Sequence, residues 1–209
     1  MNTELFYLVD YDGSSCEQPE FISGVFNYDD WEWDEFDPSA EQVMINREYK
    51  FNILDRSIKS LCVDFLGSPH NIVSKRFLEV CDGLNVSYRA VPVELNLTQN
   101  NPPRGDYFIF IPLDSVALLE QSGSEYALES DLSSGEPVFN RYHPEVPVYS
   151  WIKIFATKKN VQQDFFVCIE LMKWVCSEGF KKRAENNLVG LSFKPIDIEF
   201  SFDPWGEMS

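Results

Sequence analysis

One stretch of this sequence, residues 72–95, occurs twice, and the second copy lies 103 positions further along the chain. The copies share four identities at equal spacing: Ser74 and Ser177, Phe77 and Phe180, Val86 and Val189, and Pro92 and Pro195. Each copy starts with a serine suited to cap a helix, continues as an amphipathic helix of about three turns, and ends in a β-rich strand. The sequence therefore predicts a duplicated helix–strand unit, at about 72–95 and 175–198.

Runs rich in β-branched and aromatic residues fill much of the remaining chain and predict strands. Their bounds are 4–10, 21–26, 49–54, 58–65, 106–113, 126–128, 151–156 and 164–170. The pattern also predicts a short helix within 113–121 and a hairpin that joins 151–156 to 164–170. Because loops or hairpins join most of these runs, the expected fold class is α+β. We expect a mixed, largely antiparallel sheet with two equivalent helices packed against it.

The length of the chain suits a single domain of residues 1–209, and it also allows two pseudo-repeat lobes, 1–100 and 101–209. The loop at 98–105 is the expected seam between such lobes. The five cysteines form no C-x-x-C pair, the start lacks a basic segment, and no apolar run approaches the roughly 18 residues of a membrane span. These features predict a cytoplasmic protein with reduced cysteines and no membrane partner.

Acidic residues are concentrated at the start of the chain. Residues 1–46 contain 12 Asp and Glu but no Lys or Arg, and the whole chain has a net charge of −17. Solubility alone explains the total charge, but it does not explain the clustering. A clustered negative field repels nucleic acid and anionic membranes and attracts basic partners. The sequence therefore argues against nucleic acid as a ligand and favours a basic protein.

The densest acidic stretch, residues 27–41, alternates carboxylates with aromatic rings. Carboxylates pair with Lys and Arg, while tryptophan supplies apolar contact area and cation–π attraction. This composition is typical of a surface that binds a basic protein. The predicted partner-binding residues are Asp29, Asp30, Trp31, Glu32, Trp33, Asp34, Glu35, Phe36 and Asp37.

A second interpretation of this stretch stays open, because the chain contains its own basic region. Residues 151–183 hold seven Lys and Arg against three acids. The acids of 29–37 could dock there, with Trp31 or Trp33 in the core. The segment would then belong to the fold, although the same residues could serve both roles.

The sequence contains no recognisable catalytic, cofactor or metal motif. Its two histidines, His70 and His143, lie far apart, and each is next to a proline, as is typical of loop residues. Asp30, Glu32 and Asp34 fall at the spacing of an EF-hand calcium loop, but the glycine that such a loop requires at its sixth position is absent. The chain is therefore predicted to be no enzyme and to hold no cofactor or metal.

Several short hydrophobic patterns carry a family resemblance. They lie at 6–10, 24, 73–77, 91–94, 106–108, 175–177 and 189–193. With these patterns, from about Phe6 to Pro195, the chain resembles the bacterial polymorphic-toxin immunity proteins sometimes called immunity protein family eleven. The resemblance implies a single immunity-type domain, made in the cytoplasm, that inhibits a cognate toxin, and it supplies no catalytic residues. Residues 29–37 match no pattern of this family, as expected of a toxin-specific surface.

The expected function is therefore that of an immunity protein that binds and neutralises a cognate, basic toxin domain. Two alternatives remain. An acidic adaptor or nucleic-acid mimic would use the same surface on a basic host protein, and its gene would lack a toxin neighbour. An enzyme would need a deep pocket that joins His70 or His143 to acids and a nucleophile.

Overall fold

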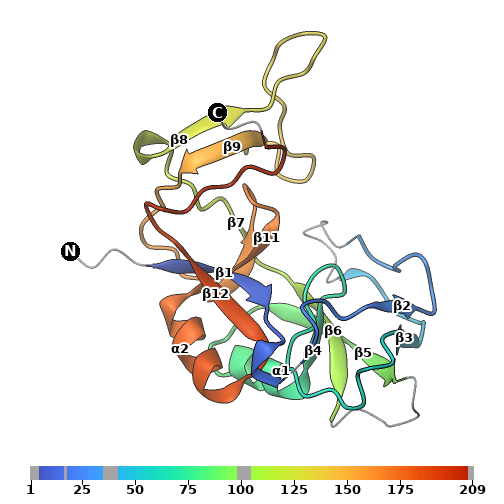
Figure 1. The fold of residues 1–209 in the computed structure, drawn as a ribbon. Coiled ribbons are helices and arrows are strands. Elements are labelled where there is room, and N and C mark those ends of the chain that lie inside the picture. Colours follow the sequence, from blue (N-terminus) through green and yellow to red (C-terminus); the bar gives the residue numbers. More distant parts are fainter. Residues whose placement is uncertain (1–4, 17, 35–41, 98–104, 207–209) are drawn as a thin grey trace.

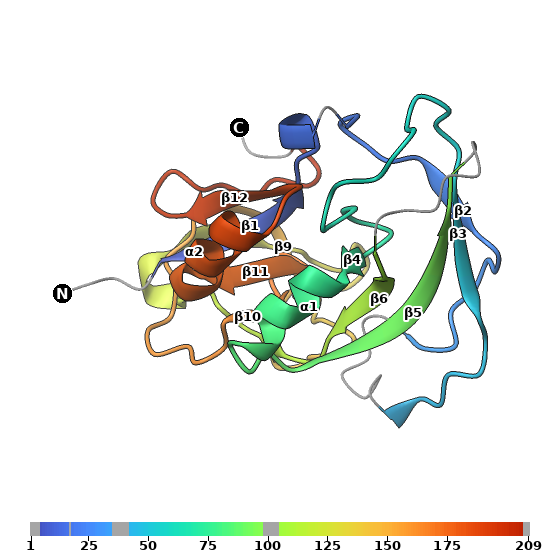
Figure 2. The same ribbon diagram turned by 90° about the horizontal axis from the view of Figure 1, so that it is seen from below.

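The computed structural model describes residues 5–16, 18–34, 42–97 and 105–206. These residues form two five-stranded sheets, a separate two-stranded sheet and two short helices (Figures 1 and 2). The predicted α+β class, with largely antiparallel pairing and a duplicated helix–strand unit, is confirmed. The strands divide between two main sheets, however, where a single sheet was expected.

The strands are β1 (Phe6–Tyr11), β2 (Gly24–Phe26), β3 (Tyr49–Ile53), β4 (Ile72–Ser74), β5 (Tyr88–Asn96), β6 (Tyr107–Pro112), β7 (Ser115–Val116), β8 (Glu125–Leu128), β9 (Tyr149–Ile154), β10 (Phe165–Cys168), β11 (Lys173–Ser177) and β12 (Leu191–Ile196). The α-helices are α1 (Lys75–Asp82) and α2 (Glu178–Asn187), and short 3-10 helices lie at Ser14–Cys16 and Gln121–Gly123. One sheet has the order β12-β1-β11-β10-β7, the other has the order β2-β3-β5-β6-β4, and β8 pairs with β9. The β8–β9 pair lies at the end of the molecule opposite the helices (Figure 1).

The duplicated stretch forms two equivalent units, β4-α1-β5 and β11-α2-β12. In each unit the predicted serine caps the helix. Ser74 Oγ accepts a hydrogen bond from the backbone N–H of Phe77 at 3.3 Å, and Ser177 Oγ accepts one from Phe180 at 3.1 Å. Such a cap satisfies an N–H group that has no partner within the helix, which fixes where each helix begins.

Each unit is completed by a strand from the other half of the chain. β6 lies between β4 and β5, and β1 lies between β11 and β12. The registers are equivalent: Tyr107 faces the capping Ser74, and Phe6 faces the capping Ser177. The N-terminal strand is therefore the central partner of the C-terminal unit, so the two halves of the sequence are interlocked.

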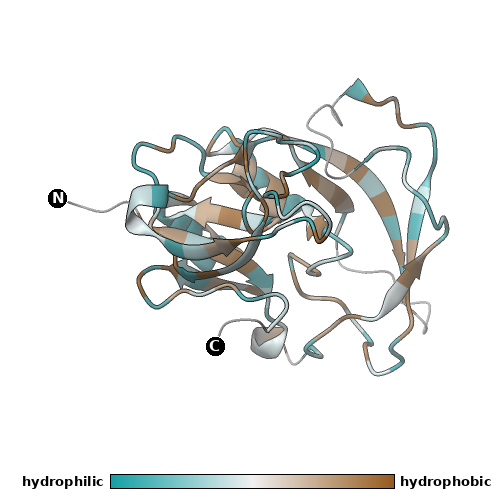
Figure 3. Cartoon of the chain, turned by 90° about the horizontal axis from the view of Figure 1, so that it is seen from above, coloured by the Kyte–Doolittle hydropathy of each residue, from teal (hydrophilic) through white to brown (hydrophobic). Residues whose placement is uncertain are grey.

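Aromatic residues fill the space between the two units. The helices lie side by side (Figure 2), and the rings of Phe77 and Phe180 are 5.7 Å apart. Phe165 packs against both rings, at 5.7 and 4.8 Å, and all three side chains are fully buried. Burial of each such ring contributes about 1.5–3 kcal/mol to stability. Hydrophobic residues follow the inner strands, whereas the loops are more hydrophilic (Figure 3).

The two units are also equivalent outside the predicted stretch, because an Asp-Phe dipeptide precedes each of them, at 64–65 in the first copy and at 164–165 in the second. In both copies the aspartate carbonyl accepts the backbone N–H of the capping serine at 2.9 Å, and the aspartate carboxylate accepts the serine hydroxyl. The phenylalanines pair with equivalent positions, Phe65 with Val73 and Phe165 with Cys176. The serine lies ten positions after the aspartate in the first copy and 13 positions after it in the second. The shift of 103 residues that aligns the two serines therefore does not align the two Asp-Phe pairs.

One predicted strand, at 58–65, and one predicted helix, within 113–121, are wrong. Residues 58–65 form no regular strand, although Ile58, Leu61 and Val63 are buried as expected. Residues 113–121 form no α-helix. Within them, Ser115 and Val116 form β7, which pairs with β10, and the N–H of Val167 donates to the Asp114 carbonyl at 2.9 Å. The apolar pattern thus reports burial correctly, but neighbouring segments determine the backbone pairing.

The predicted hairpin between 151–156 and 164–170 is also wrong, because β9 pairs with β8 and β10 pairs with β11. Most of the predicted seam at 98–105 lies outside the described residues. In the described part of the chain no helix has the length and apolar character needed to cross a bilayer, since α1 and α2 have only eight and ten residues.

Candidate acidic–aromatic site

The residues predicted to bind a partner lie in the segment that follows β2. Asp29, Asp30 and Asp34 are exposed, Trp31 and Glu32 are half-buried, and Trp33 is buried with 6% of its surface exposed. Glu35, Phe36 and Asp37 lie outside the described residues. We call residues 27–34 the acidic–aromatic segment. Its carboxylates face water more than its rings do.

The two tryptophans of this segment pack on the core of the second sheet. Their rings stack on each other with centroids 4.9 Å apart and an interplanar angle of 24°. Tyr49 contacts both, at 5.6 and 5.4 Å, and Phe26 meets Trp31 edge-on at 4.7 Å. The indoles thus hold the segment onto the fold, and Trp31 keeps the more exposed face of the two.

Glu32 ties the segment to the chain just before β3. Its carboxylate accepts the backbone N–H groups of Asn46, at 3.2 Å, and Arg47, at 2.9 Å. Although desolvation raises the pKa of Glu32, these hydrogen bonds stabilise the charged form and lower the pKa overall. Glu32 is therefore a structural anchor of the segment.

The neighbouring carboxylates have different surroundings. Asp30 pairs with the guanidinium of Arg47 at 3.1 Å, and Arg47 also lies over the ring of Tyr28, 4.8 Å from its centroid. Asp34 accepts a hydrogen bond from Tyr142 Oη at 2.5 Å, which connects the segment to the long loop between β8 and β9. Exposed ion pairs of this kind contribute little to stability, but they fix geometry.

These contacts place Asp30 and Glu32 against residues 46–49, not against the basic stretch 151–183. Several bases of that stretch have partners near their own elements. Examples are Lys153 with Glu125, Lys181 with Glu185, Lys182 with Glu178, Lys158 with the Ala117 carbonyl and Arg183 with the Gly83 carbonyl. Among the described residues, no group of three or more His, Cys, Asp or Glu side chains is arranged to hold a metal ion.

A cavity of about 220 Å³ lies between the acidic–aromatic segment and the C-terminal unit. Trp31 and Trp33 line one part of it, and Trp174 of β11 lines another. Its charged lining comes from Asp10 at the end of β1 and Lys173 at the start of β11. Neither Trp174 nor Asp10 is predictable as a site residue from the sequence, because both reach the site through the pairing of strands that are distant in sequence.

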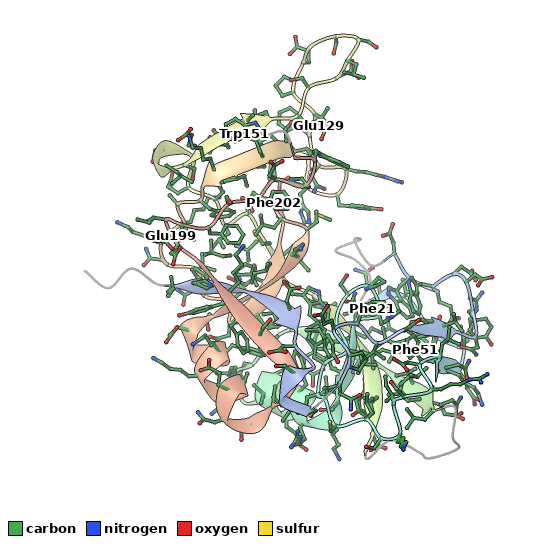
Figure 4. The ribbon with its side chains drawn as sticks, viewed as in Figure 1. Phe21, Phe51, Glu129, Trp151, Glu199 and Phe202 are labelled. Carbon is green, nitrogen blue, oxygen red and sulfur yellow. The ribbon has the colours of Figure 1, made fainter. Side chains whose placement is uncertain are left out.

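His70 also lines this cavity, and it is buried with 9% of its surface exposed. It packs against Phe51 at 4.6 Å and Phe21 at 5.6 Å, two rings that Figure 4 labels. The imidazole donates a hydrogen bond to the Ile22 carbonyl, and its Nε2 is buried without a partner among the described residues. Desolvation lowers the pKa of His70, and the bond to Ile22 opposes this only in part.

This arrangement differs from that of a catalytic histidine. Asp10 and Ser68 line the same cavity, but Nε2, the atom that would act as a general base, has no nucleophile within hydrogen-bond reach among the described residues. His143 lies apart, in the loop before β9, with Nδ1 4.0 Å from Glu145. The arrangement around His70 is that of a neutral core histidine.

The buried His70 predicts a loss of stability in mild acid. A base whose pKa is lower in the folded state binds protons preferentially when unfolded. Its contribution to stability is therefore complete above the unfolded value of about 6.5 and is lost as the pH falls below it, by at most about 1.4 kcal/mol per pH unit. Urea titrations at pH 7.5 and 5.5 measure the free energy of unfolding at each pH. We expect its decrease from pH 7.5 to pH 5.5 to be larger in the native protein than in His70→Phe.

His143→Gln is the matched control, since it removes the other histidine and retains His70. This variant should keep the acid sensitivity of the native protein. If His70→Phe shows the same fall between pH 7.5 and 5.5 as the native protein, the protonation of His70 is not its source.

The described site presents carboxylates and indole rings, which are the groups that bind ammonium and guanidinium ions. A comparison with protein-family models finds no family that matches the chain, and a comparison with curated proteins finds no significant match. The chemistry of the site is therefore the basis for a functional proposal.

Proposed function

We propose that this chain is an immunity protein that binds a cognate secreted bacterial toxin in the cytoplasm and neutralises it. The observation that carries the proposal is the acidic–aromatic segment, which presents Asp29, Asp30 and Asp34 to solvent on a backbone held in place from several sides. The short hydrophobic patterns that resemble those of immunity proteins point to the same function, although no family model matches the chain.

The fixed conformation of the segment matters for affinity. Binding loses free energy whenever a loop must be ordered on contact, and a surface that is already ordered avoids much of that loss. Here Glu32 and the stacked indoles supply the order. The net charge of −17 would speed the approach of a basic toxin and would make association sensitive to salt.

The test is an affinity capture at low salt from the bacterium that encodes this chain, with a paired growth assay. The native protein is expected to capture a basic toxin, identified by mass spectrometry as the product of a neighbouring gene. Its co-expression should restore growth to cells that produce the toxin domain. Asp29→Asn combined with Asp34→Asn should weaken capture by about tenfold or more, because each removes an exposed charge facing the partner.

A double variant with the same change in total charge serves as the control. Glu79→Gln with Glu199→Gln alters two exposed acids, one on α1 and one in the C-terminal tail, both outside the acidic–aromatic segment, and should capture toxin as the native protein does. Equal capture by the Asp29/Asp34 variant would move the interface elsewhere. Capture of a basic host protein, with no rescue of growth, would replace the immunity role by that of an acidic adaptor.

A further inference from the structure

Three of the five tryptophans of the chain line one cavity. Trp31 and Trp33 reach it from the acidic–aromatic segment, and Trp174 reaches it from β11. The cavity holds about 220 Å³, close to the lower limit for ligand sites and suited to one side chain or a small ring. Its position between two interlocked units is a common one for binding sites.

The walls of the cavity are held rigidly. Trp174 stacks on Phe65 with centroids 5.3 Å apart and an interplanar angle of 26°, and it meets Phe110 edge-on at 5.4 Å. Trp31 and Trp33, which also line the cavity, stack on each other. A ligand would therefore enter a formed site and would not have to order these rings.

The chemistry of the lining favours a cation. Indole faces attract ammonium and guanidinium groups. Asp10 is the acidic residue of the described lining, and the exposed acids Asp29 and Asp34 flank the tryptophan pair in sequence. Lys173 is the cation of the described lining, and its exposed position lets the flexible stem keep the ammonium in water. The lining thus holds one acidic and one basic residue, and its three indoles add the attraction for a cation.

We infer that this cavity receives an arginine side chain of the protein partner. The guanidinium stacks on the indole faces and donates N–H bonds to the carboxylate of Asp10. Arginine fits better than lysine because its planar group stacks on rings, is weakly hydrated and carries five donors. The inference rests on the proposed function for one point, namely that the partner is a protein. The exposed acids beyond the cavity favour a polypeptide over a free small cation, because they offer further contacts along a chain.

The cavity is tested by nuclear magnetic resonance on the intact, ¹⁵N-labelled protein, with N-acetyl-arginine methylamide as the probe. The five indole N–H signals supply an internal control. The signals of Trp31, Trp33 and Trp174 should shift in a saturable way, with a dissociation constant on the order of 1–10 mM. Those of Trp151, on the separate β8–β9 sheet (Figure 4), and Trp205 should stay in place.

Two comparisons show whether charge carries the binding. N-acetyl-citrulline methylamide has nearly the same shape as the arginine probe but no charge. Its affinity should be lower by about tenfold or more. Asp10→Asn should weaken arginine binding several-fold, whereas Asp29→Asn, which changes an acid outside the lining, should leave it within about twofold. Equal shifts with citrulline, shifts in all five indoles, or no effect of Asp10→Asn would each overturn the inference.

The result is separable from the capture experiment. Capture of the toxin without any arginine-dependent shift would keep the proposed function and exclude the cavity as an arginine site. Saturable arginine binding without toxin capture would support the cavity as an arginine site and count against the immunity role. A dipeptide that extends the capped arginine should bind at least as tightly as the single residue, because the proposed ligand is an arginine within a polypeptide. Weaker binding of the dipeptide would indicate that the site takes a free cation instead.

Discussion

Replacing Asp64 by alanine is expected to lower the free energy of unfolding by about 3–5 kcal/mol. The side chain is 4% exposed, and its two oxygens accept several hydrogen bonds. The donors are the hydroxyl of Ser74, the guanidinium of Arg76 and the backbone N–H of Val189, the last at 2.8 Å. Alanine would leave the buried donors among them unpaired, and unpaired buried groups are the more costly outcome of losing a hydrogen bond.

The location of Asp64 increases the effect. Ser74 is the cap of α1, so the carboxylate orients the residue that starts the first helix. Val189 follows α2, so the same carboxylate also holds the turn into β12. One side chain therefore connects both units, and its loss should reduce the cooperativity of the core between them as well as the stability of α1.

The duplication supplies a matched control, since Asp164 holds the equivalent position in the second unit. Its half-buried carboxylate accepts the hydroxyl of Ser177, and we expect Asp164→Ala to lower the free energy of unfolding by about 1 kcal/mol. Urea unfolding followed by tryptophan fluorescence measures both variants. Equal losses at the two positions would show that the contacts with Arg76 and Val189 contribute nothing beyond the serine cap.

The duplicated unit is predictable from sequence because its marks are local. A capping serine, an amphipathic run and a β-rich run are set by neighbours in the chain, and both serines cap helices as expected. The pairing of β1 with β11 and β12 is not predictable in this way. The alternation of a strand shows which face is buried, but it does not identify which of several antiparallel neighbours lies beside it.

The candidate site is likewise predictable from the sequence only where local properties determine it. Charge predicts the exposure of Asp29, Asp30 and Asp34, because an ionised carboxylate is costly to bury. Composition does not show that Trp33 faces the core, since tryptophan is common both in protein interfaces and in protein interiors. The cavity with Trp174 depends on the long-range pairing of strands, so it becomes visible only once the fold is known.

Dividing the chain into fragments 1–97 and 105–209 is expected to give two polypeptides that do not fold alone and that fold when mixed. The first fragment keeps β4-α1-β5 but loses β6, the strand between β4 and β5. The second keeps β11-α2-β12 but loses β1, the strand between β11 and β12. Each isolated unit would expose unpaired backbone groups in the middle of a sheet and half of the shared aromatic core.

Near-ultraviolet circular dichroism and urea titration of each fragment, and of the equimolar mixture, measure this expectation. Leu8→Arg in the first fragment should abolish recovery in the mixture, because Leu8 of β1 is buried in the core of the C-terminal unit. Val25→Arg places the same side chain on an exposed position of β2 and should permit recovery. A cooperative unfolding transition in either fragment alone would contradict the prediction, because the strand supplied by the other half would then be dispensable for that unit.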